Sequence, residues 1–173
     1  MYIPSDDTFL LAECIALYRG LCALEIGVGS GVLIPVLEKN FQNVAGSDIS
    51  LQALERCKHI SSRAMLVCCD GASAFAGVNF DLIVSNPPYL PDDHNKIKDP
   101  VIYGGPKGIE TTIRFVQSAI PLLTSDGKIL IVISSLAKID ELDQLVIESK
   151  LHKKVIKEKK LFFEVLSVIE LGH

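Results

Sequence analysis

Long apolar runs are absent from this sequence of 173 residues. None reaches the roughly 18 residues that a membrane-spanning helix needs, and the opening MYIPSDDTFLL has neither a basic segment nor a small-residue cleavage site. We therefore expect no membrane span and no secretion signal. Because 49% of the residues are apolar, the chain can bury a full core, and its length predicts a single domain over residues 1–173.

Paired cysteines are lacking as well. The five cysteines form no C-x-x-C pair, and none of the four histidines stands at ligand spacing from a cysteine pair. An odd number of such cysteines indicates buried free thiols in a reducing compartment, which predicts a cytoplasmic protein without a metal site. These cysteines are Cys14, Cys22, Cys57, Cys68 and Cys69.

The sequence also has no excess of positive charge, since 17 basic and 21 acidic residues give a net charge of −4. This balance disfavours a protein whose main partner is a nucleic-acid backbone. One segment differs, because residues 150–160, KLHKKVIKEKK, contain six lysines and one glutamate. The segment predicts either a solvated strand and turn or a docking patch for RNA or for a ribosome-associated protein.

What the sequence does have is an alternation of strand-like apolar runs and helical patterns, which predicts a parallel α/β sheet. Strands are expected at residues 21–26, 44–47, 64–69, 80–85 and 128–134, with a possible antiparallel hairpin at 155–160 and 163–171. Helices are expected from Ser5 or Asp6 to Gly20 and at 31–39, 51–58, 109–123 and 139–150, with a turn at SDG, residues 125–127. Residues 90–108 have almost no periodicity, and a loop this long is usually functional.

The segment EIGVGSG at residues 25–31 places three glycines between an expected strand and an expected helix. Glycines there allow a sharp turn and let a ligand approach main-chain N–H groups. The spacing of Gly27, Gly29 and Gly31 is G-x-G-x-G, whereas the dinucleotide fingerprint is G-x-G-x-x-G, and the acid Glu25 also departs from that fingerprint. The spacing therefore disfavours a nicotinamide oxidoreductase.

Three acids stand at the ends of three successive expected strands. Glu25 ends the first, Asp48 the second, and Asp70, followed by Gly71, the third. Open α/β sheets bind ligands at the carboxyl ends of their strands, where the strand order reverses. An acid at Asp48 can accept hydrogen bonds from both hydroxyls of a ribose, and Asp70 with Gly71 could flank an adenine edge. The pattern predicts a nucleoside site.

The fourth expected strand ends in NPPY at residues 86–89. Asn86 offers a carbonyl acceptor, and Pro88 biases Pro87 toward an extended conformation that fixes the direction of the Pro87 carbonyl. Two fixed acceptors could hold both N–H bonds of a planar –NH2 group, while Tyr89 covers its flat face. Such a clamp orients a weakly nucleophilic nitrogen and helps it pyramidalise, so catalysis would rest on positioning and electrostatics without a dedicated general base.

The pieces EIGVGSG, SDIS, CCDG and NPPY, in this order and spacing, resemble a class I S-adenosylmethionine-dependent methyltransferase. The segments YIPSDDTFLL, NPPYLP and YGGPKGIE resemble the HemK family, in the short archaeal and eukaryotic branch that methylates the glutamine of class 1 translation release factors. This resemblance covers nearly the whole chain. It implies a Rossmann-like α/β fold with a seven-stranded, mostly parallel sheet, an antiparallel C-terminal hairpin and helices on both faces. It also implies methyl transfer from S-adenosylmethionine to a glutamine side-chain amide.

The resemblance implies a role for each matching residue. The residues that would hold the cofactor are Thr8, with Pro4 and Ser5, at the methionine part, Glu25, Gly27 and Gly29 at the amino-acid and sulfonium region, Asp48 at the ribose, Asp70 and Gly71 at the adenine, and Asn86. The residues that would hold the substrate amide are Asn86, Pro87, Pro88 and Tyr89, of which Asn86, Pro87 and Tyr89 would be catalytic. The loop YGGPKGIE at residues 103–110 would shape the substrate mouth.

Two positions depart from the family pattern, because Tyr103 stands where a tryptophan is expected and Lys107 where an acid is expected. Both bear on the substrate and leave the cofactor residues intact. Bacterial members of the family also carry an N-terminal helical domain that grips the release factor. The sequence begins at Met1, just before the expected cofactor site, so we expect that domain to be absent.

The third expected strand, AMLVCC at residues 64–69, lies at the sheet edge in the family's usual strand order and contains no lysine or proline. An unprotected edge strand invites strand addition by a partner. The resemblance suggests the small zinc-binding activator that supports several methyltransferases of the translation machinery. A neighbouring loop or a self-dimer could cover the edge instead.

Other interpretations of the site stay open. The same clamp would suit the exocyclic amine of adenine or guanine in RNA or DNA, although the acidic balance and the lack of a nucleic-acid-binding domain count against it. A protein lysine fits less well, because its cationic amine would have to lose a proton. A catalytically silent S-adenosylmethionine-binding subunit is disfavoured by the intact NPPY motif.

Overall fold

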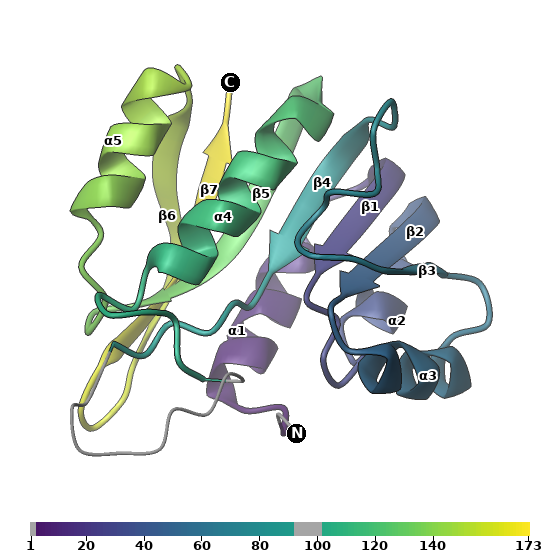
Figure 1. Cartoon of the computed structure of the whole chain (residues 1–173), viewed down its shortest axis with the longest axis horizontal. Coiled ribbons are helices and arrows are strands. Elements are labelled where there is room, and N and C mark those ends of the chain that lie inside the picture. Colours follow the sequence, from purple (N-terminus) through teal and green to yellow (C-terminus); the bar gives the residue numbers. More distant parts are fainter. Residues whose placement is uncertain (1–2, 92–101) are drawn as a thin grey trace.

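A sheet with helices on both faces forms from residues 3–91 and 102–173, the part of the chain that the computed structural model describes (Figure 1). The strands are β1 (Gly20–Ile26), β2 (Phe41–Asp48), β3 (Met65–Cys68), β4 (Phe80–Ser85), β5 (Leu123–Ser134), β6 (His152–Lys160) and β7 (Val165–Gly172). The helices are α1 (Asp6–Ile15), α2 (Ile34–Leu37), α3 (Leu51–Ile60), α4 (Glu110–Ala119) and α5 (Asp140–Glu148), with a 3-10 turn, η1 (Ile120–Leu122).

The strand order across the sheet is β3-β2-β1-β4-β5-β7-β6. Strands β1 to β5 pair in parallel, whereas β7 runs antiparallel to both β5 and β6. The order reverses between β1 and β4, and ligands of open α/β sheets bind at the carboxyl ends of such strands. The predicted Rossmann-like fold, its antiparallel terminal hairpin and the edge position of the third strand are confirmed.

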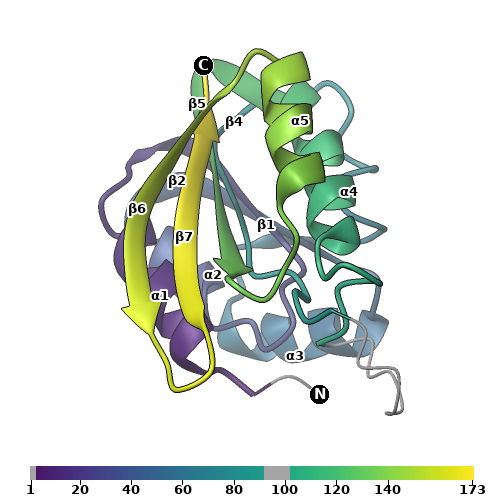
Figure 2. The same cartoon turned by 90° about the vertical axis from the view of Figure 1, so that its left-hand side faces the viewer.

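Alternate residues of the central strands face two separate hydrophobic cores. On β4, Leu82 faces the core covered by α1, α2 and α3, while Ile83 faces the core covered by α4 and α5. Leu130 and Ile131 of β5 divide in the same way. Because both faces are buried, these strands are almost continuously apolar. Figure 2 shows α1 on one side of β5 and β7, with α4 and α5 on the other.

Prolines and strand pairing shorten the expected helices. Pro35 lies in the first turn of α2, so this helix begins at Ile34 and not at residue 31, and it ends at Leu37 because β2 starts at Phe41. Pro121 converts the end of the expected helix 109–123 into the 3-10 turn η1. The first helix ends at Ile15, since Gly20 already belongs to β1. The prediction of a turn at residues 125–127 that separates the helix from the next strand is wrong, because this segment lies within β5. The pairing of β4 with β5 shifts register there and accommodates the extra residues.

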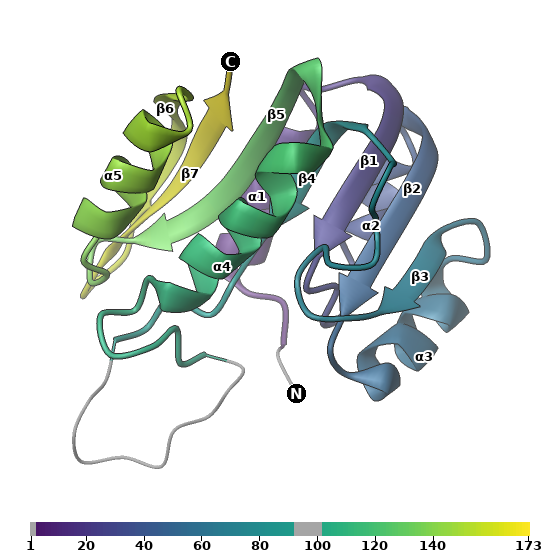
Figure 3. The ribbon, with the colours of Figure 1, turned by 45° about the horizontal axis from the view of Figure 1, so that its top comes forward.

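The two edge strands of the sheet are β3 and β6, which lie at opposite sides of Figure 3. The lysine-rich β6 is exposed along most of its length, and several of its ammonium groups meet acids of α1 and α5. These ion pairs are Lys153–Asp143, Lys157–Glu13 at 2.5 Å and Lys159–Asp6 at 2.8 Å. The segment 150–160 thus agrees with the interpretation of a solvated strand. Within the described ranges, no helix has the length and apolar character that crossing a membrane requires.

Candidate active site

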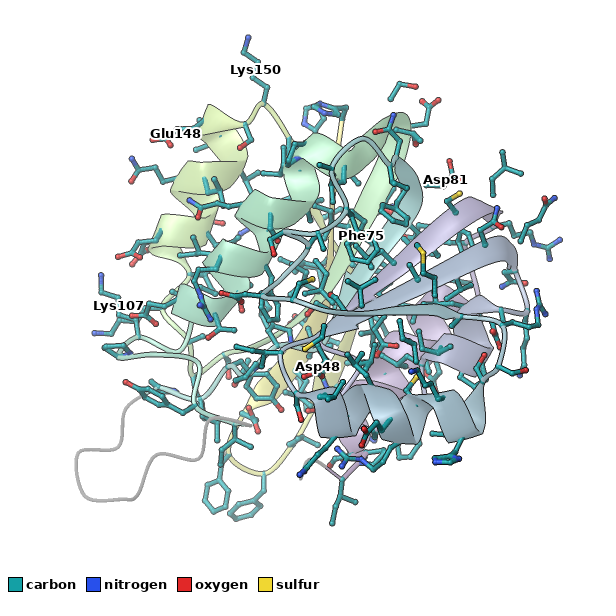
Figure 4. All side chains as sticks on the ribbon, turned by 45° about the vertical axis from the view of Figure 1, so that its right-hand side comes forward. Asp48, Phe75, Asp81, Lys107, Glu148 and Lys150 are labelled. Atoms are coloured by element: carbon teal, nitrogen blue, oxygen red, sulfur yellow. The ribbon has the colours of Figure 1, made fainter. Side chains whose placement is uncertain are left out.

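The turns that follow β1 and β4 lie side by side at the carboxyl end of the sheet. Ile26, the last residue of β1, pairs with Ser85, the last of β4, and the Ser85 hydroxyl donates a 2.8 Å hydrogen bond to the Ile26 carbonyl. The glycine turn and the NPPY segment therefore start from neighbouring positions. Figure 4 shows Asp48 at this end of the strands and Asp81 at the opposite end.

The turn after β1 needs glycine at two positions in particular. Gly27 and Gly31 have φ angles of +78° and +79°, a region that residues with a Cβ rarely adopt. The Gly31 N–H donates to the Val28 carbonyl at 2.7 Å, which closes the turn. A Cβ added to Gly31 would lie 3.1 Å from the Cys57 sulfur, so this glycine also lets the turn pack against α3.

The carboxylate of Asp48 is fixed by two main-chain N–H groups. Its Oδ2 accepts from Gly29 at 2.9 Å, and its Oδ1 accepts from Ser50 at 2.8 Å. Each oxygen of a carboxylate can accept more than one hydrogen bond, so both keep a lone pair for a ligand hydroxyl. One main-chain donor of the glycine turn is thus used inside the protein to orient the acid that was predicted to bind ribose.

A cavity of about 620 Å³ opens beside these turns, a volume that suits a nucleoside-sized ligand. Most of the predicted site residues line it, namely Gly27, Gly29, Asp48, Asp70, Gly71, Asn86, Pro87, Pro88 and Tyr89. Four others do not line it: Thr8 and Glu25, which are both only 3% exposed, and Pro4 and Ser5. The structure therefore brings nine of the predicted residues to one cavity, and Thr8 contacts one of them, Asn86.

Glu25 is a buried carboxyl at the carboxyl end of β1, two residues before Gly27. Its Oε2 has no hydrogen-bond partner among residues 3–91 and 102–173. Burial raises the pKa of Glu25 well above its ordinary value, and the nearby Asp48 carboxylate raises it further. A buried acceptor that lacks a donor is unfavourable in the protein alone, and a cationic group from a ligand would relieve it.

The NPPY segment is tied to the first helix by two side-chain contacts. The Asn86 amide nitrogen donates to the Thr8 hydroxyl at 3.3 Å, and the Tyr89 hydroxyl donates to Oδ2 of Asp7 at 2.9 Å. The other carboxylate oxygen of Asp7 accepts from the Thr8 N–H at 2.6 Å. Both Asp7 and Thr8 are buried, so α1 holds the two polar side chains of NPPY in fixed directions.

The predicted adenine end of the cavity is built from α4 as well as from β3. Asp70 forms an ion pair of 3.2 Å with Arg114, and both side chains are more than half exposed, so we expect this pair to add little stability. The Gly71 carbonyl accepts a 2.7 Å hydrogen bond from the buried Ser47 hydroxyl. This contact fixes the turn after β3 against the end of β2.

A family model described as Methyltransferase small domain matches residues 6–167. The chain belongs to this methyltransferase family. The methyltransferase is similar to a protein of Methanocaldococcus jannaschii that is provisionally named a protein N5-glutamine methyltransferase. The two are 30% identical over 144 residues, which cover 79% of this chain and 73% of the relative.

The release factor glutamine methyltransferase of Streptococcus pneumoniae is also 30% identical over 144 residues, which cover 73% of this chain and 52% of that relative. The methyltransferase described here thus spans about half the length of the bacterial relative. Among solved structures, the E. cuniculi Mtq2–Trm112 complex, responsible for methylation of the eRF1 translation termination factor, is similar with a TM-score of 0.77 and 26% identity, over 99% of this chain and 97% of that chain. The resemblance to HemK-type methyltransferases is confirmed.

Several residues of the methyltransferase cavity were not predicted from the sequence. They include Asp7, Arg56, Arg114, Phe115 and Glu164. The ring of Phe115 lies 3.7 Å from where a Cβ would stand on either Gly27 or Gly71, so it bridges the turns after β1 and β3. The sequence held no distinct signal for Phe115, because it falls at the helical spacing of the buried residues Thr112 and Ala119 and packs partly against the core.

The loop predicted to shape the substrate mouth, residues 103–110, contributes less directly to the cavity of the methyltransferase. Its neighbours Ile102 and Thr111 line the cavity. Lys107, the position where an acid was expected, directs its ammonium group to Glu141 at the start of α5. Its main-chain N–H donates to Glu110 at 3.0 Å. Part of the long expected loop, residues 92–101, lies outside the described residues.

Proposed function

We propose that the chain transfers a methyl group from S-adenosylmethionine to the side-chain amide nitrogen of a glutamine in a class 1 translation release factor. The observation that carries this proposal is the position of Asn86 and Pro87, which directly follow β4 and line the same cavity as Gly27 and Asp48. A pair of acceptors suited to an –NH2 group and a nucleoside-binding pattern therefore share one space.

The cofactor side of the cavity fits S-adenosylmethionine on two observations. Asp48 is fixed by main-chain donors and keeps lone pairs for ribose hydroxyls. Glu25 has a buried oxygen without a hydrogen-bond partner in the described part of the chain, which suits the ammonium group of the methionine part. Asp70 and Gly71 would flank the adenine. When bound, S-adenosylmethionine supplies an electrophilic methyl group on its sulfonium sulfur.

The protein would contribute mainly by holding the substrate amide. The side-chain oxygen of Asn86 and the main-chain carbonyl of Pro87 would each accept one N–H of the glutamine –NH2 group. The donation from the Asn86 nitrogen to Thr8 supports this role, because it leaves the oxygen of the same amide on the other side. Accepting both N–H bonds orients the nitrogen lone pair and favours its pyramidal form as it attacks. Tyr89 would pack against the flat face of the amide.

A glutamine is favoured over a nucleobase by two findings. The relatives from M. jannaschii and S. pneumoniae are both named for glutamine methylation, and the E. cuniculi complex is described as acting on a translation termination factor. In addition, the most lysine-rich strand, β6, has three of its ammonium groups paired with acids of the chain itself. Only Lys154 and Lys160 of this strand have no ion pair in the described part of the chain, which is little charge for binding a phosphate backbone.

We further propose that a small zinc-binding partner adds a strand to the edge of β3. In the described part of the chain this strand pairs only with β2, and Met65 at its start is 54% exposed. The solved E. cuniculi relative is a complex with a second protein, Trm112, which agrees with a need for a partner. The test is to produce the chain with and without that subunit. A lone chain that is soluble, monomeric and fully active would remove the partner proposal.

The function itself is tested by following labelled methyl groups. The protein is incubated with labelled S-adenosylmethionine and, in separate reactions, with purified release factor, with release factor plus its GTPase partner, and with total RNA. Label on a glutamine of the release factor is the expected result, located by mass spectrometry of the digested product. Label in RNA alone would refute the proposal. We also propose a cytoplasmic setting for a single-domain protein, which the five free thiols support. Only Cys14 and Cys57 are buried as expected; the expectation is wrong for Cys22 and Cys69, which are half-buried, and for Cys68, which is exposed.

A further inference from the structure

Two neighbouring phenylalanines stand in solvent at the turn between β6 and β7. Phe162 is 93% exposed and Phe163 is 84% exposed, the highest values among the large hydrophobic residues that the structure describes. Their ring centroids are 4.6 Å apart and their planes meet at 83°, an edge-to-face pair. Single exposed apolar residues are common on proteins, but a paired aromatic patch more often marks a site of interaction.

The turn that carries these rings is held firmly. The Leu161 N–H donates to the Glu164 carbonyl at 2.8 Å, which closes the turn. The Glu164 carboxylate accepts from the Ser134 hydroxyl at the end of β5. Two further hydrogen bonds of 2.9 Å join Ser135 and Val165. The phenylalanines therefore project from a fixed stem, and a partner would bind them with little loss of main-chain entropy.

The same turn reaches the candidate active site. Since β7 runs antiparallel to β5, the start of β7 lies beside the end of β5, at the carboxyl end of the parallel strands. Figure 2 shows the β6–β7 turn projecting beyond the strands at this end. Glu164, the residue after Phe163, lines the cavity that also holds Asn86 and Tyr89. The two rings therefore stand on the same turn as a residue of the cavity lining.

We propose that Phe162 and Phe163 form a docking point for the protein substrate, taking apolar side chains of the polypeptide near the reactive glutamine. This inference rests on the proposed function and adds to it a surface that recognises the substrate outside the cavity. A polypeptide is favoured over a nucleic acid because little positive charge is left beside the rings. Lys157 is paired to Glu13 and Lys159 to Asp6, which leaves Lys160 as the nearest stem lysine without an ion pair in the described part of the chain. A strand of RNA would need a groove lined by several unpaired cations beside its stacking rings.

The test compares the double variant F162A/F163A with a matched control, L17A/I147A. Leu17 and Ile147 are 73% and 74% exposed and do not line the cavity, so the control removes similar apolar surface elsewhere. For the docking variant we expect kcat/KM for the full-length release factor to fall about tenfold, mostly through KM, as is typical when an exposed aromatic anchor is lost. The affinity for S-adenosylmethionine, measured by calorimetry, should stay as in wild type. The control should match wild type in both measurements.

A second variant, F162L/F163L, keeps most of the apolar surface and should retain kcat/KM within about threefold of wild type. Thermal melting of each variant should match wild type, because both side chains are in solvent. An unchanged kcat/KM in F162A/F163A would overturn the docking proposal while leaving the methylation of the release factor intact. The proposal would also be overturned if sedimentation showed that the wild type is a dimer and that F162A/F163A is a monomer. The rings would then bind a second copy of the chain.

Wild-type protein that labels RNA and no release factor would overturn the proposed function, and the docking inference with it. That outcome is read from the wild-type reaction alone, before any variant is compared. The wild-type reaction therefore tests the proposed function, and the comparison of F162A/F163A with wild type tests the docking inference.

Discussion

The hydroxyl of Tyr89 donates a 2.9 Å hydrogen bond to Oδ2 of Asp7, a residue 82 positions earlier in the chain. Asp7 is 4% exposed and also holds the N–H of Thr8, whose hydroxyl accepts from the Asn86 amide. The start of α1 thereby fixes the aromatic ring and the amide of the NPPY segment together. A buried acid in this position serves the geometry of the site.

Loss of the Tyr89–Asp7 contact is expected to slow turnover. Tyr89→Phe keeps the ring and removes the hydroxyl, so we expect a destabilisation of about 1 kcal/mol and a fall in kcat of about tenfold from a less fixed ring. The matched control is Tyr18→Phe, which removes a hydroxyl that donates to Glu170 at 2.5 Å away from the cavity. The control should lose similar stability in denaturant unfolding but keep its kcat. Equal effects of both changes on kcat would contradict a positioning role for Tyr89.

Asn86→Ala is expected to separate chemistry from cofactor binding. Removing one of the two proposed acceptors should lower kcat about a hundred- to a thousandfold, while the affinity for S-adenosylmethionine changes little. Asn40→Ala is a suitable control, since the Asn40 side chain donates to the Ala16 main-chain carbonyl at 3.3 Å and lies outside the cavity. Single-turnover methylation and calorimetry give the two quantities. A large loss of cofactor affinity in Asn86→Ala would assign Asn86 mainly to the cofactor.

Cofactor affinity is expected to depend on pH through Glu25. Because burial raises the pKa of Glu25, the carboxyl keeps its proton to higher pH in the protein alone, whereas the ammonium of S-adenosylmethionine favours the carboxylate. Binding should therefore release a proton, and affinity should rise with pH until Glu25 is ionised. Calorimetry in two buffers of different ionisation enthalpy measures this proton. Glu25→Gln should abolish the proton release, and Glu55→Gln, on the exposed surface of α3, should not.

The raised pKa of Glu25 also predicts how stability varies with pH. The folded chain holds this proton at pH values where the unfolded chain has lost it, so the contribution of Glu25 is fully present below the ordinary glutamate pKa. It is lost as pH rises toward the folded-state value. Without cofactor, Glu25→Gln should therefore flatten the fall in unfolding free energy over this window, as measured by urea unfolding at several pH values. A parallel slope in wild type and variant would show that Glu25 is not the group concerned.

Two glycines with almost the same main-chain angle provide a test of the turn after β1. Gly31 and Gly77 have φ angles of +79° and +80°, but a Cβ on Gly31 would meet Cys57 and Ile60 at 3.1 Å, whereas nothing lies within 4 Å at Gly77. Both Gly→Ala changes carry the strain of a left-handed residue, about 1–2 kcal/mol. Gly31→Ala should lose roughly 1–3 kcal/mol more from overpacking. Equal losses in urea unfolding would mean that the turn adjusts without strain.

Much of the site could be predicted because its signals are local. The strand ends, the glycine turn and the NPPY segment each depend on a few consecutive residues, and parallel pairing brings such ends to one edge of the sheet. The residues that were missed come from elements whose sequence looks ordinary. Phe115 and Arg114 belong to an amphipathic helix, and only the placement of α4 over the turns after β1 and β3 gives them a place at the cavity.

The sequence by itself determined the order of strands and helices, the prolines that limit two helices, and the residue types at each strand end. The tertiary structure decided how deeply each of those residues is buried and which groups it bonds to. Glu25 became a buried acid with a raised pKa while Asp48 was fixed by main-chain donors at the cavity wall, and Asp7 met Tyr89 across 82 positions. Burial and long-range hydrogen bonding depend on which distant segments pack together, and a pattern of neighbouring residues carries no such information.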